Sequence, residues 1–207
     1  MCQWNIKRNC IYIRAFWHSN NYWKRSRGNG NGKFHSQRFV RHQTRDCKNL
    51  KSNLISKSET ADLLKTVSEK WRIEFPKIKN LKVHQIADEA QIITGQGIKI
   101  LKINDEYLPF LSETQLLEKF PHVTVDMGAV KFMCKGANVM RPGIKSHSEF
   151  EKEKIVCIIE ESQHKFLAVG KSLVSSSELE NMEKGEVVKN MHYISDKFWE
   201  MGKTIYD

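Results

Sequence analysis

The sequence of 207 residues predicts an α+β protein in which a small α/β domain is followed by a β-barrel with short helices. Two patterns predict this fold. Apolar residues fall on helical stripes that alternate with strand-like runs up to about residue 122, and the chain becomes strand-rich after Pro121. No apolar period persists before residue 50. We therefore expect a disordered basic extension, an α/β domain and a barrel domain, over residues 1–50, 51–123 and 124–202.

The α/β domain is predicted to open with an amphipathic helix. Ser56 and Glu59 have the spacing of a capping box, and Pro76 is expected to end the helix. The apolar stripe between them consists of Leu63, Leu64, Val67, Trp71 and Phe75. Three short strands are expected over residues 82–87, 90–94 and 98–103. A second helix follows Ser112, and helices covering one face of an antiparallel sheet would bury these side chains.

The barrel domain is predicted from short β-prone runs. Residues 154–160 and 165–171 favour a hairpin, a short helix begins at about Ser176, and a last strand reaches Tyr193. Asp126 is expected to cap a helical segment that ends at Cys134. Because closure of a sheet removes its exposed edges, a partly closed barrel is the expected packing.

The segment from Gly136 to Ile144 has the composition of a functional loop. Its two glycines, Gly136 and Gly143, can adopt backbone angles closed to other residues, and Pro142 fixes a turn. Such a loop presents backbone N–H groups, and cations lie around it at Lys135, Arg141 and Lys145. One interpretation is therefore a phosphate site. The other is a tight connection between two buried strands, which the local sequence alone favours.

Charge does not identify a binding surface on the folded part. Residues 1–50 hold 11 Lys+Arg and one acid, Asp46, so 11 − 1 = +10, which is the whole formal charge of the chain. The remainder holds 34 − 11 = 23 basic and 24 − 1 = 23 acidic residues. Any nucleic-acid site on the patterned region must therefore be a local patch rather than a generally basic surface.

Four blocks of the sequence together resemble a PUA domain, an RNA-binding module. Their order and spacing are similar to those of the malignant T-cell-amplified sequence family and its archaeal relatives, in which a pre-PUA domain precedes the PUA domain. The resemblance covers about Ser52 to Met201. The blocks are Val125–Phe132, Gly136–Ile144, Phe166–Gly170 and His192–Met201.

The resemblance implies a non-catalytic protein that binds structured RNA, either tRNA or small-subunit ribosomal RNA, in translation initiation or ribosome recycling. The Lys135-Gly136-Ala137 loop would supply backbone donors, and nearby cations would attract phosphates. The family motif is matched by Gly136, Ala137, Pro142 and Gly143, and charge adds Lys135, Arg141 and Lys145. Three further lysines are assigned from flanking charge alone: Lys131, Lys171 and Lys189.

Two other functions and two interpretations of the extension stay open. The pre-PUA domain would serve as a protein-binding surface, so the chain could act mainly as an interaction adaptor, or as an accessory subunit that delivers RNA to a modification enzyme. The extension is either a basic arm that grips RNA or chain translated from upstream of the true start codon. We favour the second, because the resemblance begins near Ser52 and needs nothing before it.

The residues predict no catalytic, cofactor or metal site. Gly170-Lys171-Ser172 matches the end of a P-loop, but Lys165 stands where a glycine is required, and no local Ser/His/Asp or Cys/His motif occurs. The five cysteines lack any Cys-x-x-Cys pair and are typical of reduced thiols in a cytoplasmic protein, with Cys134 and Cys157 as core residues. No membrane segment is expected, since the run Ile11–Ile13 is interrupted at Arg14.

Overall fold

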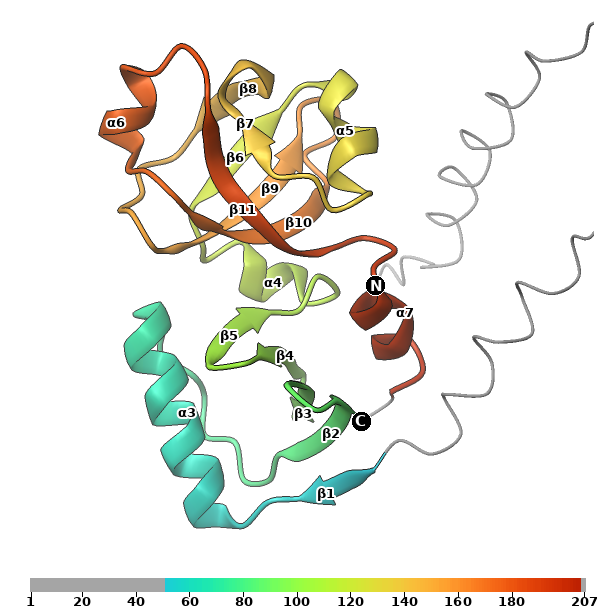
Figure 1. The fold of residues 1–207 in the computed structure, drawn as a ribbon. Helices are drawn as coiled ribbons and strands as arrows, with labels where there is room; N and C mark the ends of the chain where they lie inside the picture. The colour runs from blue at the N-terminus through green and yellow to red at the C-terminus, as the bar shows by residue number, and fades with distance from the viewer. Residues whose placement is uncertain (1–50, 206–207) are drawn as a thin grey trace, which may run out of the picture. The chain divides into compact units, whose positions relative to one another are not determined.

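The computed structural model describes residues 51–205, which form two β-sheets flanked by short helices (Figure 1). The described residues all fall within one compact unit of the chain. The predicted basic extension, residues 1–50, lies outside the described residues. Within the described range, no helix has the length and apolar character needed to cross a membrane.

The first sheet is antiparallel, and its strands follow one another in chain order. The three predicted strands are confirmed, and the sheet gains one more strand at each edge. The turn between the third and fourth strands places Gln96 at φ 46° and Gly97 at φ 79°, as a tight hairpin requires. The strands are β1 (Ser52–Leu54), β2 (Lys82–Ala87), β3 (Ala90–Gly95), β4 (Ile98–Ile103) and β5 (Glu106–Pro109).

Helix α3 (Lys57–Trp71) covers one face of this sheet. The predicted capping box is present, with Ser56 and Glu59 each bonding the other's backbone N–H. The helix ends earlier than predicted, because Arg72 adopts a left-handed conformation (φ 55°) and its N–H donates to Ser68 O. At this end the Trp71 indole N–H donates to Tyr107 O at 2.9 Å, which anchors the helix to β5.

The second sheet curls into a nearly closed barrel with the strand order β7-β11-β10-β9-β6-β8. The edge strands β7 and β8 are joined only by the 3-10 turn η3 (Arg141–Gly143), and so short a link holds the two edges close together. The predicted hairpin is confirmed as β9–β10. The strands are β6 (His122–Val125), β7 (Val139–Met140), β8 (Ile144–His147), β9 (Ile155–Glu160), β10 (Phe166–Ser172) and β11 (Glu186–Tyr193).

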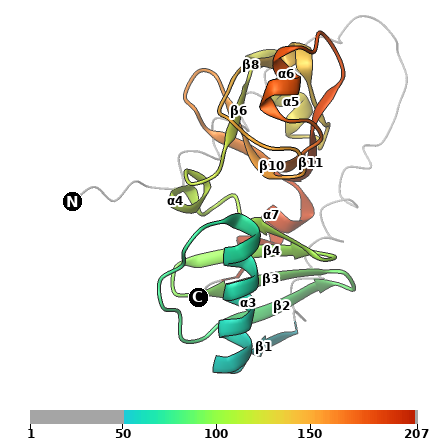
Figure 2. The same cartoon turned by 90° about the vertical axis from the view of Figure 1, so that its left-hand side faces the viewer.

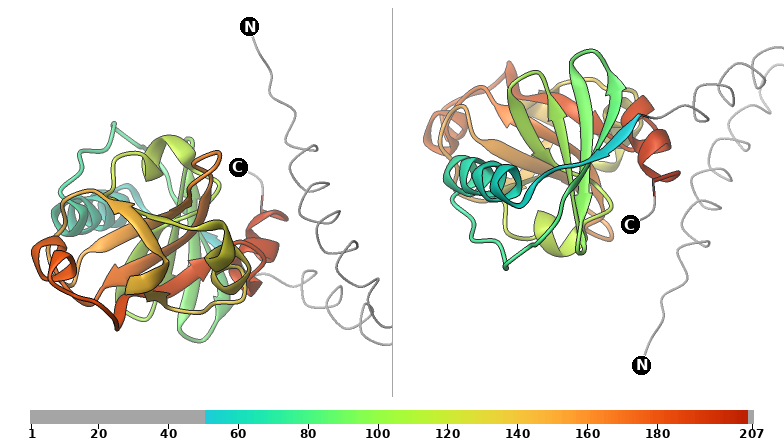
Figure 3. Two further views of the ribbon diagram at one scale, coloured as in Figure 1. Left: turned by 90° about the horizontal axis from the view of Figure 1, so that it is seen from above. Right: turned by 90° about the horizontal axis from the view of Figure 1, so that it is seen from below.

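Four short helices complete the described part of the chain. Helix α4 (Thr114–Leu117) links the sheets, whereas α5 (Met127–Met133) and α6 (Ser176–Glu180) lie on the barrel. Helix α7 (Lys197–Gly202) instead returns to the first sheet, on the face opposite α3 (Figures 2 and 3). Helix α3 covers one face of that sheet as expected, and the C-terminal helix supplies a second layer that the sequence analysis did not predict.

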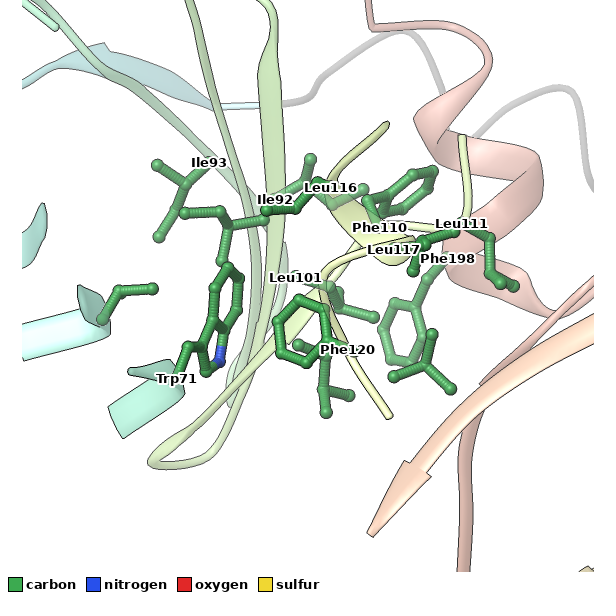
Figure 4. Close-up of a cluster of buried hydrophobic side chains, with 14 of the residues drawn as sticks. Trp71, Ile92, Ile93, Leu101, Phe110, Leu111, Leu116, Leu117, Phe120 and Phe198 are labelled. Carbon is green, nitrogen blue, oxygen red and sulfur yellow. The ribbon is translucent and has the colours of Figure 1, made fainter. Parts of the chain in front are cut away.

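The core of the first sheet continues across the junction with the barrel. Phe198 of α7 lies among Phe110, Leu111 and Leu117 (Figure 4), and the same cluster takes in side chains from the barrel strands β9 and β10. Gly202 lies so close to the Phe110 ring that an added Cβ would clash with it. The two sheets are thus joined by shared apolar packing.

His192 provides the polar counterpart of this junction. Its ring is fully buried, Nδ1 lies 2.7 Å from Asp196 Oδ2, and Nε2 accepts the N–H of Leu111 at 3.5 Å. Because Nε2 is the acceptor, Nδ1 carries the proton, and this N–H donates a hydrogen bond to Asp196. Asp196 also accepts the N–H groups of Tyr193 and Trp199, and so caps α7. His192 therefore bonds both to the segment that leaves the first sheet and to the residue that caps α7.

We predict that Asp196→Ala lowers the free energy of unfolding by about 2–4 kcal/mol, because it removes the α7 cap and leaves buried His192 without its acceptor. Ser175→Ala is the matched control: it removes the side-chain cap of exposed helix α6 and should cost about 1 kcal/mol. Urea denaturation with unchanged m-values measures both. Equal losses would contradict a special role for the His192–Asp196 pair.

Candidate nucleic-acid interface

Helix α5 is the first element of the candidate site, and two acidic side chains accept hydrogen bonds from the N–H groups of its first turn. The Asp126 carboxylate accepts the N–H of Ala129 at 2.7 Å, which confirms the predicted cap. The N–H of Met127 donates to Glu161 Oε1 at 3.0 Å. The helix buries Met133 and leaves Lys131 and other side chains exposed, so one of its faces is open to solvent.

The loop after α5 does not offer the backbone donors that the sequence analysis assigned to it. The N–H groups of Lys135 and Ala137 donate to Phe132 O, and that of Gly136 donates to Met133 O. This is a Schellman ending, in which Gly136 takes the left-handed position at φ 84°. All three N–H groups bond to carbonyl groups of the last helical turn. They are therefore not free to bind a phosphate, and the predicted backbone contacts do not fit this loop.

Two side chains of β11 fix the shape of this loop. The Asn190 amide donates to Met133 O and Ala137 O, and the Asn190 N–H donates to Asn138 Oδ1. The Tyr193 ring lies against Gly136, where a Cβ would come within 2.7 Å of it. Sequence reasoning missed Asn190 as a site residue, because only the fold brings β11 beside the end of α5.

The Arg141–Gly143 turn serves mainly to close the barrel. The Arg141 N–H donates to Gly185 O, and its Nε donates to Leu179 O at 3.0 Å, which ties the half-buried side chain toward α6. Gly143 O accepts the N–H of Asp126, and Gly143 has no left-handed backbone angle. Pro142 and Lys145 are exposed. The special conformation expected of Gly143 is therefore wrong.

Lys171 is placed in the junction between the sheets rather than at the loop. Its Nζ lies 2.9 Å from Glu106 of β5 and 2.9 Å from Glu153. The hydrogen bond to Glu106 raises the pKa of Lys171 most, and the hydrogen bond to Glu153 raises it further. Lys189 is exposed opposite Lys171 in the β10–β11 register. We expected Lys171 to add electrostatic attraction around the loop. Its ammonium group is instead held by two carboxylates.

Lys131 and Lys135 are exposed cations beside the loop, and Lys145 and Lys189 are likewise exposed without an ion pair among residues 51–205. Neither Lys131 nor Lys135 forms an ion pair with any carboxylate of residues 51–205. The Lys131 Nζ lies 5.0 Å from the centroid of the Phe132 ring. An ammonium group beside an aromatic face is weakly attracted to it and stays accessible to an anion.

Large exposed apolar side chains gather in the same segment. The described residues include four of these, and three come from the stretch between the start of α5 and the end of β7: Met127 (52% exposed), Phe132 (51%) and Met140 (46%). We use the name α5–β7 surface for the exposed apolar and cationic side chains of this segment that the argument uses, namely Met127, Lys131, Phe132, Lys135 and Met140. Phe132 and Met140 escaped sequence reasoning, because their exposure depends on how α5 and β7 pack on the barrel.

A cavity of the described chain lies away from this surface. It has a volume of about 880 Å³ and is lined by the end of α3, the β8–β9 connection and the start of α6, with cations and carboxylates mixed. It includes none of the ten predicted site residues. Residues 51–205 also bring together no group of three or more His, Cys, Asp or Glu side chains able to hold a metal ion.

The two cysteines in the described chain are packed rather than reactive. Cys157 is fully buried and its Sγ donates to Leu117 O at 3.7 Å, whereas Cys134 is half-buried at the end of α5. Burial raises the pKa of both thiols, which disfavours the thiolate. Cys157 is therefore the core residue that was predicted, and Cys134 lies at the rim of the barrel core.

Comparisons with known proteins agree with the geometry. The PUA domain family model matches residues 121–194. Malignant T-cell-amplified sequence 1 of Danio rerio is 30% identical over 166 residues, which cover 75% of this chain and 91% of that protein. Translation machinery-associated protein 20 of Saccharomyces cerevisiae is 31% identical over 136 residues, 60% of this chain and 74% of that protein.

A solved structure has the same fold. A hypothetical protein from the hyperthermophilic archaeon Pyrococcus horikoshii superposes with a TM-score of 0.62 at 25% sequence identity. The match covers 72% of this chain and 98% of that chain, so both sheets are represented in it.

We predict that Gly136→Ala destabilises the protein by about 2–4 kcal/mol, because it combines a left-handed angle with a clash against the Tyr193 ring. Gly97→Ala is the control: Gly97 has φ 79° but nothing within 4 Å of the added Cβ, so only backbone strain of about 1 kcal/mol is expected. Thermal and urea unfolding compare the two variants. If both cost the same, the Tyr193 contact does not shape the loop.

Proposed function

The chain belongs to the malignant T-cell-amplified sequence family, and on that premise we propose that it is a non-catalytic protein that binds structured RNA through a PUA domain. The target is tRNA or ribosomal RNA, and the process is translation initiation or ribosome recycling. The PUA match and the name of the yeast relative support this proposal. We propose domains over residues 51–123 and 124–202, and action in the cytoplasm.

The observation that carries the proposal is the α5–β7 surface. Lys131 and Lys135 are exposed without an ion-pair partner in residues 51–205, whereas Lys171 is neutralised by two carboxylates. Residues 51–207 have equal numbers of acidic and basic side chains, so their net charge does not attract RNA. Attraction must come from local cations without an ion-pair partner, such as these two lysines. RNA phosphates would bind the lysine side chains, not the backbone N–H groups of the loop.

Other residues of the predicted site would have supporting roles. In this proposal, Gly136, Ala137, Pro142 and Gly143 would set the path of the chain on either side of β7 rather than contact the RNA directly. Lys145 and Lys189 would add attraction at longer range. The first sheet would then be available for a protein partner, as the family resemblance implies.

Reversing the charge of both lysines tests this proposal. We expect Lys131→Glu/Lys135→Glu to weaken binding of tRNA or a ribosomal RNA fragment by about tenfold or more at about 0.15 M salt. The slope of log K against log salt concentration should fall by about 0.7–0.9 for each phosphate that the variant no longer neutralises. Filter binding with the full chain at several salt concentrations measures both quantities.

Lys77→Glu/Lys79→Glu is the control, since both lysines are exposed on the connection between α3 and β2 and the change in charge is the same. This variant corrects for attraction that follows net charge alone. Equal loss of affinity in the two variants, or no loss in either, would refute the α5–β7 surface as the RNA site, provided that both variants melt cooperatively at the wild-type temperature.

A further inference from the structure

The last described segment, residues 197–205, packs on the first sheet without adding a strand to either sheet. Its buried residues Phe198, Gly202 and Ile205 recur at the i, i+4, i+7 spacing of one helical face. The backbone N–H groups of this segment bond within it or to the residue that caps it, rather than to a strand. A segment held by side chains instead of a β-ladder opens locally at a lower free energy than the sheets do.

Lys99 of β4 fastens the far end of this segment to the first sheet. Its Nζ donates to Gly202 O at 3.0 Å and to Ile205 O at 3.4 Å, and it lies 5.3 Å from the centroid of the Phe110 ring. The last carbonyl groups of a helix have no partner inside the helix, and an ammonium group at this end satisfies them and complements the helix dipole. Lys99 is half-buried and forms no ion pair with a carboxylate of residues 51–205, so its charge is committed to this segment.

The near end of the segment is fastened by the buried pair that joins the barrel to the first sheet. Asp196 Oδ1 accepts the N–H of Trp199 at 2.6 Å, and Asp196 Oδ2 holds His192, whose Nε2 accepts the N–H of Leu111. When α7 leaves, Asp196 loses the helix that it caps, and the shielding of this pair from water goes with it. The bond between His192 and Leu111 therefore depends on the closure of the segment.

We infer that residues 197–205 are a strap that opens as one unit, with Lys99 as its latch, and that its opening frees the barrel to turn against the first sheet. Phe198 is the strap's contribution to the apolar cluster shared by the two sheets, where it lies with Phe110 and Leu117 (Figure 4). Opening removes this packing from the junction at the same time as it releases the Asp196 cap. The closed strap thus sets the orientation of the barrel relative to the first sheet.

Two ion pairs also cross the junction among the described residues, and neither replaces the strap. Arg72 and Glu151 lie 3.6 Å apart, with 70% and 63% of their side-chain surfaces exposed. Exposed ion pairs of this kind contribute little to stability, and salt screens them. Lys171 and Glu106 form a closer pair at 2.9 Å, but a contact at one point does not fix the angle between two sheets.

Hydrogen exchange of the full chain, measured by mass spectrometry with fragmentation to single amides, tests the inference. Lys99→Met keeps the aliphatic stem and removes the ammonium group. We expect it to speed exchange of the strap amides of Glu200, Lys203 and Thr204 about tenfold, and to speed exchange of the Leu111 N–H with them. Amides of the β9–β10 ladder should stay within about twofold of wild type, because the barrel itself does not open. Lys99→Arg retains a cation and should restore slow exchange.

Lys102→Met is the matched control. Lys102 is also half-buried on β4, and its Nζ lies 5.6 Å from the Tyr107 ring, but three residues along a strand place it on the face opposite Lys99. Its strap amides should exchange as in wild type. Faster exchange confined to residues 203–205 in Lys99→Met would show fraying of the chain end and overturn the inference. Unchanged exchange in Lys99→Met, equal effects of the two methionine variants, or equally faster exchange in the β9–β10 ladder would overturn it as well.

Discussion

The buried bond between His192 and Asp196 is the constraint on which the described structure depends. It sits where the last barrel strand leaves the second sheet, and each residue of the pair holds a different element: Leu111 beyond the first sheet, and the start of α7. Because α7 then packs Phe198 and Gly202 against Phe110, the sheets share one core. Removing the acceptor would leave a buried imidazole N–H without a partner, which costs more than losing an exposed cap.

Strand β11, which contains His192, also positions the loop of the candidate site. Asn190 and Tyr193 of β11 lie on either side of His192 in the strand, and they set the loop that ends α5. The loop therefore has a fixed path with its N–H groups satisfied, and side chains are left to meet a ligand. The proposed RNA binding would therefore use lysine ammonium groups rather than backbone N–H groups of this loop.

Local signals in the sequence were sufficient for the elements that depend on near neighbours. The capping box at Ser56, the cap at Asp126 and the β9–β10 hairpin follow from residues close together in the chain. Tertiary packing decided the rest. The end of α3 at Arg72, the return of α7 to the first sheet and the capture of Lys171 by Glu106 all require partners distant in the chain or backbone angles that no motif specifies. The exposure of Phe132 likewise becomes visible only once the barrel is assembled.

The central claim is that RNA contacts the segment from Met127 to Met140. Ultraviolet crosslinking of the full chain to bound tRNA or ribosomal RNA, followed by mass spectrometry of the crosslinked peptides, tests it most directly. The account predicts crosslinks at Phe132 and its flanking residues. Crosslinks confined to residues 1–50, or to the cavity between α3 and the β8–β9 connection, would contradict it.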